Sequence, residues 1–198
     1  SLINVSGPKG AKTLKKSANS IGLYSESFGT SGLSIPGFPG MGDTSYLEAG
    51  NYTFNNGAGG ADVRGFNANL TIAGALNWTN KATTTTVSRA QGLTVNWTGA
   101  DPSGYVVVFG YSSIDASTNS TTVSFVCTER GSAGTFTVPP QVLLALPPTP
   151  TGSAALDDAP FGALALSSGS NPVSFTAPGL DVGTIVNTSA IFKTVIYN

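Results

Sequence analysis

The chain has 198 residues and a formal net charge of -1. Charged residues make up only 10% of it, against about 25% in an average soluble protein. This near-neutral composition excludes the broad basic field with which proteins gather nucleic acid or anionic membranes, so we expect neither as a partner.

Four lysines lie close together near the start of the chain, at Lys9, Lys12, Lys15 and Lys16. We predict that they occupy a solvated loop or the exposed face of an edge strand, because lysines on an edge discourage unwanted strand addition. A patch that binds polyanions is the alternative interpretation. For the Gly/Pro-rich stretch that follows at 29–43, we predict a long surface loop.

Alternating apolar and polar residues predict strands along the next part of the chain. The glycine-rich run at 55–65 lacks the lysine of a phosphate-binding loop and lies among predicted strands, so we expect a hairpin loop. The stretch "ANLTIAGALNWTN", at 68–80, has one apolar face, formed by Leu70, Ile72, Leu76 and Trp78. Gly74, in its middle, predicts a bulge.

A second strand, at 92–99, repeats the pattern with Leu93, Val95 and Trp97 on its apolar face. Both tryptophans continue the apolar stripe of their own strand. We therefore predict that Trp78 and Trp97 form a wall of the core. The alternative is that either indole is a platform on which a sugar ring stacks.

After a turn at 99–104, residues 105–111 are apolar on both faces, which is typical of a strand in the middle of a sandwich. Further strands are predicted at 121–128, 134–138, 172–177 and 189–197. One short helix is predicted within 139–148, where prolines open and close an apolar run of helical spacing. The Pro-rich stretch at 147–160 is predicted to be a second long surface loop.

Cys127 is the single cysteine of the chain. An intramolecular disulfide, a cysteine zinc site and a Cys-X-X-Cys pair are therefore excluded. Cys127 shares one strand face with Val123 and Phe125, which predicts burial as a small apolar residue.

Cutting the chain at either long loop would leave an end piece of about 30 to 40 residues, too short to hold a core by itself. We therefore predict one domain over residues 1–198, in which 1–45 form an N-terminal strand and a Gly/Pro-rich loop region packed on the rest. The predicted fold class is all-β. It is an antiparallel two-sheet sandwich with immunoglobulin-like or related Greek-key topology, long Gly/Pro-rich loops and at most one short helix.

The chain contains no histidine, which excludes Ser-His-Asp and Cys-His catalysis and the common zinc hydrolase sites within it. Glu26, Glu48, Glu129 and the seven aspartates could pair as in a glycoside hydrolase, but none stands in a recognisable motif. Asp157 and Asp158 supply too few oxygens for the six to eight that calcium takes. We assign no catalytic, cofactor-binding or metal-binding residue.

The longest apolar run, at 142–146, is far shorter than the roughly 20 residues of a membrane helix, so membrane insertion is not expected. The absence of histidine, the scarcity of charge and the abundance of Ser, Thr and Asn favour an extracytoplasmic bacterial protein. The first residue, Ser1, is typical of a mature or recombinant form. Asn-X-Ser/Thr sequons, which we interpret as surface polar residues, begin at Asn4, Asn51, Asn69, Asn77, Asn96, Asn119 and Asn187.

A succession of motifs over residues 46–198 resembles a known group of proteins. The motifs are "YLEAGNYTF", "ALNWTN", "GLTVNWTGADPSGYVVVFG", "SFVC", "GTFTVPPQVLLALPP" and "FKTVIY". Their order is similar to that in uncharacterised secreted bacterial β domains, many of them immunoglobulin-like. The resemblance implies export and a β sandwich, and it supplies no site residue.

The function that we expect from these observations is non-enzymatic: a secreted or cell-surface structural or adhesive β module. Its partner would be a protein or polysaccharide surface, within a larger secreted assembly or precursor. The alternative is a carbohydrate-binding module that uses exposed aromatic residues, for which the candidates are Tyr46, Tyr52, Tyr105 and Tyr111. A glycoside hydrolase is the third hypothesis.

Overall fold

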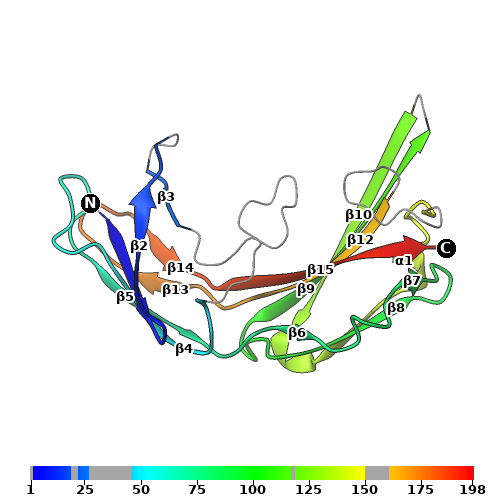
Figure 1. Ribbon diagram of the computed structural model, residues 1–198, viewed down its shortest axis with the longest axis horizontal. Coiled ribbons are helices and arrows are strands. Elements are labelled where there is room, and N and C mark those ends of the chain that lie inside the picture. Colours follow the sequence, from blue (N-terminus) through cyan, green and yellow to red (C-terminus); the bar gives the residue numbers. More distant parts are fainter. Residues whose placement is uncertain (1, 19–21, 27–45, 117–118, 150–160) are drawn as a thin grey trace. The chain divides into compact units, whose positions relative to one another are not determined.

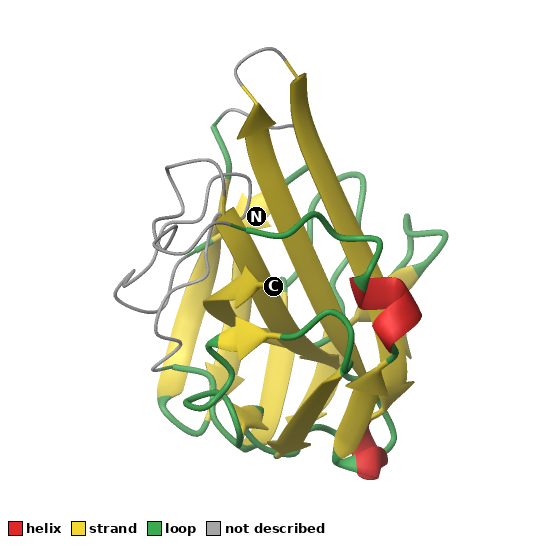
Figure 2. Ribbon diagram, turned by 90° about the vertical axis from the view of Figure 1, so that its right-hand side faces the viewer, coloured by secondary structure: helices red, strands yellow, loops and turns green. Residues whose placement is uncertain are grey.

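A computed structural model describes residues 2–18, 22–26, 46–116, 119–149 and 161–198. Within them the protein is all-β, as predicted, with antiparallel sheets, one single-turn α-helix and one 3-10 turn (Figure 2). The chain divides into two compact units, unit 1 (residues 1–74 and 170–187) and unit 2 (residues 75–169 and 188–198). Whether they fold together as the one domain predicted over 1–198 stays a prediction, as does the immunoglobulin-like topology.

Unit 1 is built on a five-stranded antiparallel sheet in the order β3-β2-β1-β4-β5 (Figure 1). These strands are β1 (Ile3–Gly7), β2 (Gly10–Lys16), β3 (Tyr24–Ser25), β4 (Gly50–Asn55) and β5 (Asn67–Ile72). The loop predicted at 55–65 does join a hairpin, β4 to β5. A second hairpin, of β13 (Val173–Phe175) and β14 (Gly183–Ile185), completes the unit.

The core of unit 1 lies on one face of its sheet. Its buried side chains are Val5, Tyr46, Tyr52, Leu70 and Ile72. The β13–β14 hairpin adds Ile185 to this core. The ring of Phe175 packs on Phe66, with 4.7 Å between the ring centroids.

Unit 2 contains two sheets. The larger has the order β10-β9-β12-β15-β7, and the smaller has the order β11-β8-β6. All pairs are antiparallel except β15–β7. The strands are β6 (Asn77–Trp78), β7 (Thr86–Val87), β8 (Leu93–Thr98), β9 (Tyr105–Ala116), β10 (Asn119–Arg130), β11 (Thr135–Val138), β12 (Phe161–Gly169) and β15 (Thr188–Tyr197). The helical turns are η1 (Gly131–Ala133) and α1 (Pro140–Leu143).

The core of unit 2 draws on both sheets and on α1, so this unit has the layered packing of a sandwich. The larger sheet contributes Val106, Val108, Leu164 and Leu166, among others. The smaller sheet contributes both tryptophans, and Leu143 of the predicted short helix is fully buried. Residues 105–111 form a central strand, as their two apolar faces predicted, because β9 lies between β10 and β12.

The single apolar face predicted over 68–80 is wrong. The segment forms β5 and β6, and the residues between them are not in a strand. Leu70 and Ile72 are buried in the core of unit 1, whereas Leu76 and Trp78 are buried in the core of unit 2. Apolar and polar residues alternate regularly on both sides of Gly74, so the sequence pattern does not reveal that the chain passes from unit 1 to unit 2 there. The strand β12 is not predicted by the sequence pattern, because its small residues give a weak strand signal.

Glycines on these strands leave room for aromatic rings across the sheet. Gly110 lies directly opposite Phe125, and a Cβ added to Gly110 would lie 2.0 Å from the Phe125 ring. Gly169 lies opposite Tyr105 in the same way, at 2.5 Å. Each ring therefore occupies the space that a side chain at the glycine would need.

The loops predicted at 29–43 and 147–160 lie wholly or largely outside the described residues. The N-terminal strand predicted within 1–45 is present as β1, which is followed by β2 and β3. No helix among the described residues is long and apolar enough to cross a membrane.

Candidate functional site

Two of the tyrosines proposed as sugar platforms are core residues of unit 1, so that prediction is wrong for them. Tyr46 is 3% exposed and Tyr52 is fully buried. Their rings pack edge to face, with 6.1 Å between centroids. Both hydroxyls are satisfied by backbone groups of unit 1.

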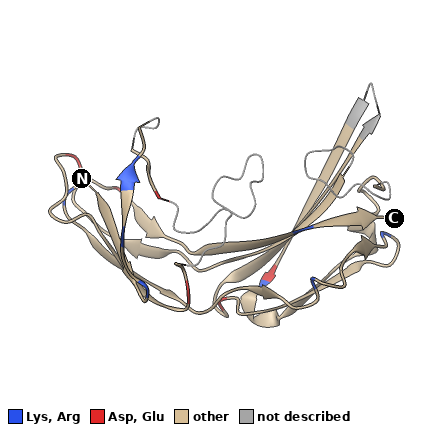
Figure 3. Cartoon of the chain, viewed as in Figure 1, with Lys and Arg blue, Asp and Glu red and all other residues tan. Residues whose placement is uncertain are grey.

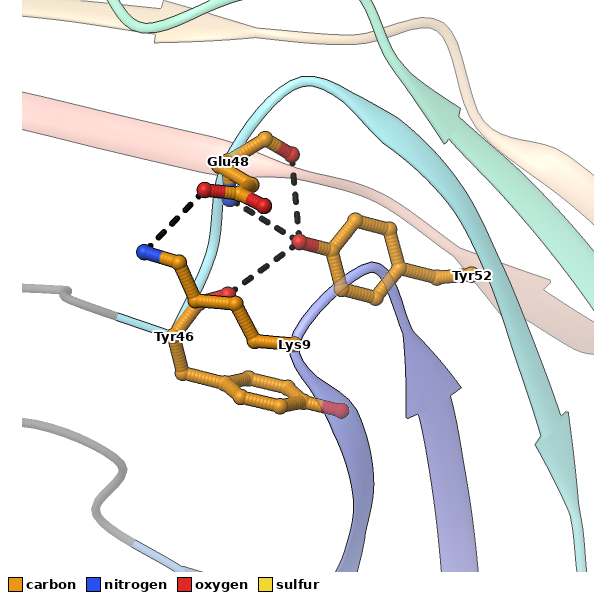
Figure 4. A network of polar contacts seen from close by, with 4 residues as sticks. All are labelled: Lys9, Tyr46, Glu48 and Tyr52. Carbon is orange, nitrogen blue, oxygen red and sulfur yellow. Dashed lines mark hydrogen bonds and ion pairs between the residues drawn. The ribbon is translucent and has the colours of Figure 1, made fainter.

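Figure 4 shows how the Tyr52 hydroxyl is held. It accepts the Glu48 N–H at 2.9 Å, and the carbonyl oxygens of Glu48 and Tyr46 lie 3.1 and 3.3 Å from it. The Tyr46 hydroxyl donates to the Gly10 carbonyl at 2.8 Å. Burial, and then the neighbouring Tyr52, raise the pKa of Tyr46. Both hydroxyls therefore hydrogen-bond to backbone groups of unit 1, and the rings are not exposed to solvent.

The lysines near the N-terminus lie on exposed positions of β2 and the turn before it, as predicted. Lys9 pairs with Glu48 at 3.1 Å, and Lys15 pairs with Glu26 at 3.4 Å. The Lys12 ammonium lies 5.8 Å from the centroid of the Tyr46 ring. These contacts favour the interpretation of a solvated strand over that of a polyanion-binding patch.

The three glutamates named as hydrolase candidates have local structural contacts. Glu26 and Glu48 form the ion pairs with lysine, and Glu129 accepts the N–H of Arg130 at 2.7 Å. No three His, Cys, Asp or Glu side chains of the described residues lie close enough together to hold a metal. Asp157 and Asp158 lie outside those residues.

Trp78 and Trp97 lie directly opposite each other on β6 and β8. Both are buried, at 4% and 3% exposure, which confirms the prediction that they wall the core. The Trp97 indole N–H donates to the buried Gly131 carbonyl at 3.0 Å, and that of Trp78 donates to Asn80 Oδ1 at 3.0 Å. Neither indole is available as a sugar platform.

Cys127 is half-buried and packs against the core of unit 2 beside Val123 and Phe125. The face that these three residues were predicted to share is confirmed. Burial raises the pKa of the Cys127 thiol. The thiol is therefore less ionised at neutral pH than that of an exposed cysteine.

The outward face of the larger sheet of unit 2 carries apolar residues, and we call it the apolar face. Residues directly opposite one another in a sheet share a face. One row across this face runs through Val126 on β10, Phe109 on β9, Ala165 on β12 and Phe192 on β15. Val126 is 65% exposed at the end of the row, whereas Ala165, within it, is 6% exposed.

The other two candidate tyrosines lie on this apolar face. Tyr105 is 40% exposed and stands over Gly169. Tyr111 is half-buried and packs on Phe161, with 5.1 Å between centroids and 34° between ring planes. Tyr105 is the one aromatic side chain among the exposed large apolar residues described. The described aromatics thus form no exposed coplanar row.

The outward face of the smaller sheet is different, and we call it the polar face. Its strand residues are Asn77, Thr94, Asn96, Thr98, Thr135 and Thr137. Thr79, in the turn after β6, adds to them and bonds to the Asn96 carbonyl. Thr135 donates to Asn96 at 2.7 Å, and the hydroxyls of Thr94 and Thr137 lie 2.9 Å apart. The face carries no charge. Its side chains are hydrogen-bonded across the strands.

Unit 1 has a similar array. Thr53 donates to Asn69 at 3.0 Å, and Thr71 donates to Asn51 at 2.8 Å, between directly opposed residues of β4 and β5. Sequence reasoning did not find either array. The Asn-X-Thr sequons could have predicted these arrays, because Asn and Thr two positions apart on a strand lie on the same face.

Comparisons with known proteins return no match to the chain: no protein-family model, no curated protein and no solved structure. The resemblance to secreted bacterial β domains therefore stays a prediction.

Proposed function

We propose that the chain is a non-enzymatic secreted or cell-surface module that adheres to a neutral polysaccharide surface. The uncharged Asn/Thr array of the polar face carries this proposal. Amides and hydroxyls are the donors and acceptors that sugar hydroxyls match, and an amide keeps bonding capacity after one hydrogen bond. A strand-borne array also holds these groups in fixed register, so that little side-chain freedom is lost on binding.

The low charge of the chain supports the same proposal. Charged residues make up 10% of the sequence, and Figure 3 marks where those of the described residues lie along the ribbon. Adhesion through such a surface depends little on salt, because ionic screening acts on charges and not on neutral hydrogen bonds.

A depletion assay tests this function with insoluble neutral polysaccharides, such as cellulose and chitin, at low and high salt. We expect the protein to leave the supernatant equally at both salt concentrations. Asn96→Asp with Thr94→Asp places charge in the polar face and should abolish depletion. Thr176→Asp, at another exposed threonine, is the matched control and should bind as the parent protein does.

Two outcomes would contradict the proposal. One is release of soluble sugar from the polysaccharide, which would make the protein an enzyme. The other is unchanged depletion by the double variant, provided that its melting temperature matches that of the control.

The carbohydrate-binding module with an aromatic platform remains a second candidate, because Tyr105 is exposed and lies on the same sheet face as the Tyr111–Phe161 pair. Under this candidate, Tyr105→Ala would abolish depletion while the polar-face variants bind normally. The two candidates therefore predict opposite results with the same assay.

A further inference from the structure

The strand β10 forms one edge of the larger sheet of unit 2, and it is longer than the strands at the other sheet edges. It has 12 residues. The other boundary strands, β3, β5, β7, β11 and β6, have between two and six. Within the described residues, no strand pairs with the side of β10 that faces away from β9. Beyond Ser113, where β12 ends its pairing, β9 and β10 continue as a two-stranded ribbon (Figure 1).

The free edge of β10 lacks the residues that usually protect an edge. Residues 119–128 contain no proline, glycine or charged residue, and the charges on β10 are Glu129 and Arg130 at its end. By contrast, β2 in unit 1 carries Lys12 on the part of the strand where β3, which pairs only with Lys15 and Lys16, does not reach. Lysine, proline and short length are the devices by which natural edges avoid pairing with another chain. The edge of β10 has none of them.

The backbone of β10 presents donors and acceptors outward at alternate residues. Gly131, which follows β10, donates its N–H to Gly104, in line with the register of β10 on β9. In an antiparallel ladder, residues with the same parity as Gly131 face the same neighbour. Cys127 therefore directs its backbone groups toward β9, whereas Ser124, Val126 and Thr128 direct theirs to the open edge.

We propose that this edge pairs with β10 of a second copy of the chain, antiparallel and around a two-fold axis at Val126. Val126 then lies opposite Val126 of the partner subunit, in the most exposed position of the apolar row. The row Phe192–Ala165–Phe109–Val126 of one subunit then continues into the same row of the partner subunit, in reverse order. Two five-stranded sheets become one sheet that buries the exposed valine.

The charges on β10 fit this register. Arg130 lies opposite a threonine, Thr122 of the partner subunit, and Glu129 lies opposite Val123 of the partner subunit. The two copies of Glu129 are then six residues apart along the pair, about 20 Å at the rise of an antiparallel strand. That exceeds the screening length of about 8 Å at physiological salt, so like charges do not oppose the pairing.

Light scattering during size exclusion tests the proposal over a range of protein concentrations. We expect a dimer for the parent chain. Val126→Lys sets two ammonium groups opposite each other and should raise the dissociation constant by about tenfold or more. Val182→Lys is the matched control. Val182 is also an exposed valine, at 77%, and lies in unit 1, so this variant should dimerise normally.

A second variant separates pairing from folding. Ser124→Pro removes a backbone N–H that faces the open edge, and proline is tolerated at such positions. It should give a monomer whose circular dichroism matches that of the parent chain.

A third variant fixes the register. Directly opposed, hydrogen-bonded residues have Cα atoms about 5.5 Å apart, a separation that a disulfide spans. In a Cys127→Ser background, Val126→Cys should therefore form a disulfide-linked dimer under mild oxidation, whereas Val182→Cys should not. A monomeric parent chain at every concentration would overturn the proposal, and so would equal dimerisation by Val126→Lys. Absence of the Val126→Cys cross-link would overturn the register.

Discussion

The two units of the chain hold themselves together by different means. The described core of unit 2 contains sixteen buried side chains from two sheets and a helix, of which only Tyr197 and the two tryptophans carry a polar atom. That of unit 1 contains five, and two of them are tyrosines. Apolar burial is non-directional, so a two-layered core depends on volume and packing. A small core that includes hydroxyls depends on each hydroxyl finding its partner.

This comparison predicts that the largest single effect arises from removing an aromatic side chain from the core of unit 2. Trp97→Ala should lower the free energy of unfolding by about 3 to 5 kcal/mol, because a large buried ring leaves a cavity. Chemical denaturation followed by circular dichroism measures it. Thr98→Ala, on the next and exposed residue, should change stability by no more than about 0.5 kcal/mol. Equal effects of the two changes would mean that Trp97 is not a core residue.

Overpacking tests the same core from the opposite direction. Gly110→Val would bring its side chain into the ring of Phe125 and should destabilise unit 2 by about 1 to 3 kcal/mol. Adding Phe125→Ala vacates that space. The double variant should therefore lose less stability than the sum of the two single variants, which a double-mutant cycle measures. Strict additivity would contradict the proposed contact.

Unit 1 should respond to the loss of a single oxygen. Tyr52→Phe keeps the ring but leaves the part-buried Glu48 N–H without its acceptor, and the loss of this hydrogen bond should lower the free energy of unfolding by about 1 kcal/mol. Tyr105→Phe makes the same chemical change on an exposed tyrosine and should be nearly neutral. Thermal denaturation compares them. If Tyr52→Phe melts like Tyr105→Phe, the hydroxyl network does not stabilise unit 1.

Alkaline pH distinguishes buried from exposed tyrosines. Burial, partly offset by a backbone hydrogen bond with Tyr111, raises the pKa of Tyr197 above its ordinary value near 10. A raised folded-state pKa contributes stability that is fully present below about pH 10 and is lost as the pH rises through the folded-state value.

We therefore expect denaturant midpoints to fall above about pH 10. Tyr197→Phe should flatten that fall, although it also removes the hydrogen bond to the Ala163 carbonyl. Tyr105→Phe should leave the fall unchanged. If the denaturant midpoints of the parent chain and of Tyr197→Phe fall equally steeply with pH, the raised pKa of Tyr197 does not contribute to the loss of stability.

The smallest effect concerns Cys127, which should react slowly with an alkylating reagent in the native protein and quickly after denaturation. Its half-buried thiol has a raised pKa, and reaction requires an accessible thiolate. Mass spectrometry of labelled protein measures both rates. Native labelling as fast as that of the denatured chain would show that the thiol is exposed.

The fold class and most strands could be predicted from the amino-acid order, because alternation with a period of two is a local property of the chain. That order also placed both tryptophans in a core and Cys127 on the face of Val123 and Phe125. It did so because Trp97 and Cys127 each continue an apolar stripe within their own strand, and Trp78 continues the alternation that begins at Leu76. The short helix could also be predicted from local sequence, because prolines mark where it begins and ends.

Which core each apolar stripe joins, and which tyrosines are buried, depends on contacts between distant parts of the chain. Alternation continues across Gly74 although the residues before and after it belong to different units. A tyrosine hydroxyl is compatible with burial or exposure until distant backbone groups supply its partners, as Gly10 does for Tyr46. The two outward faces of unit 2 and the open edge of β10 depend likewise on strand order, which is set by pairing between segments far apart in the chain.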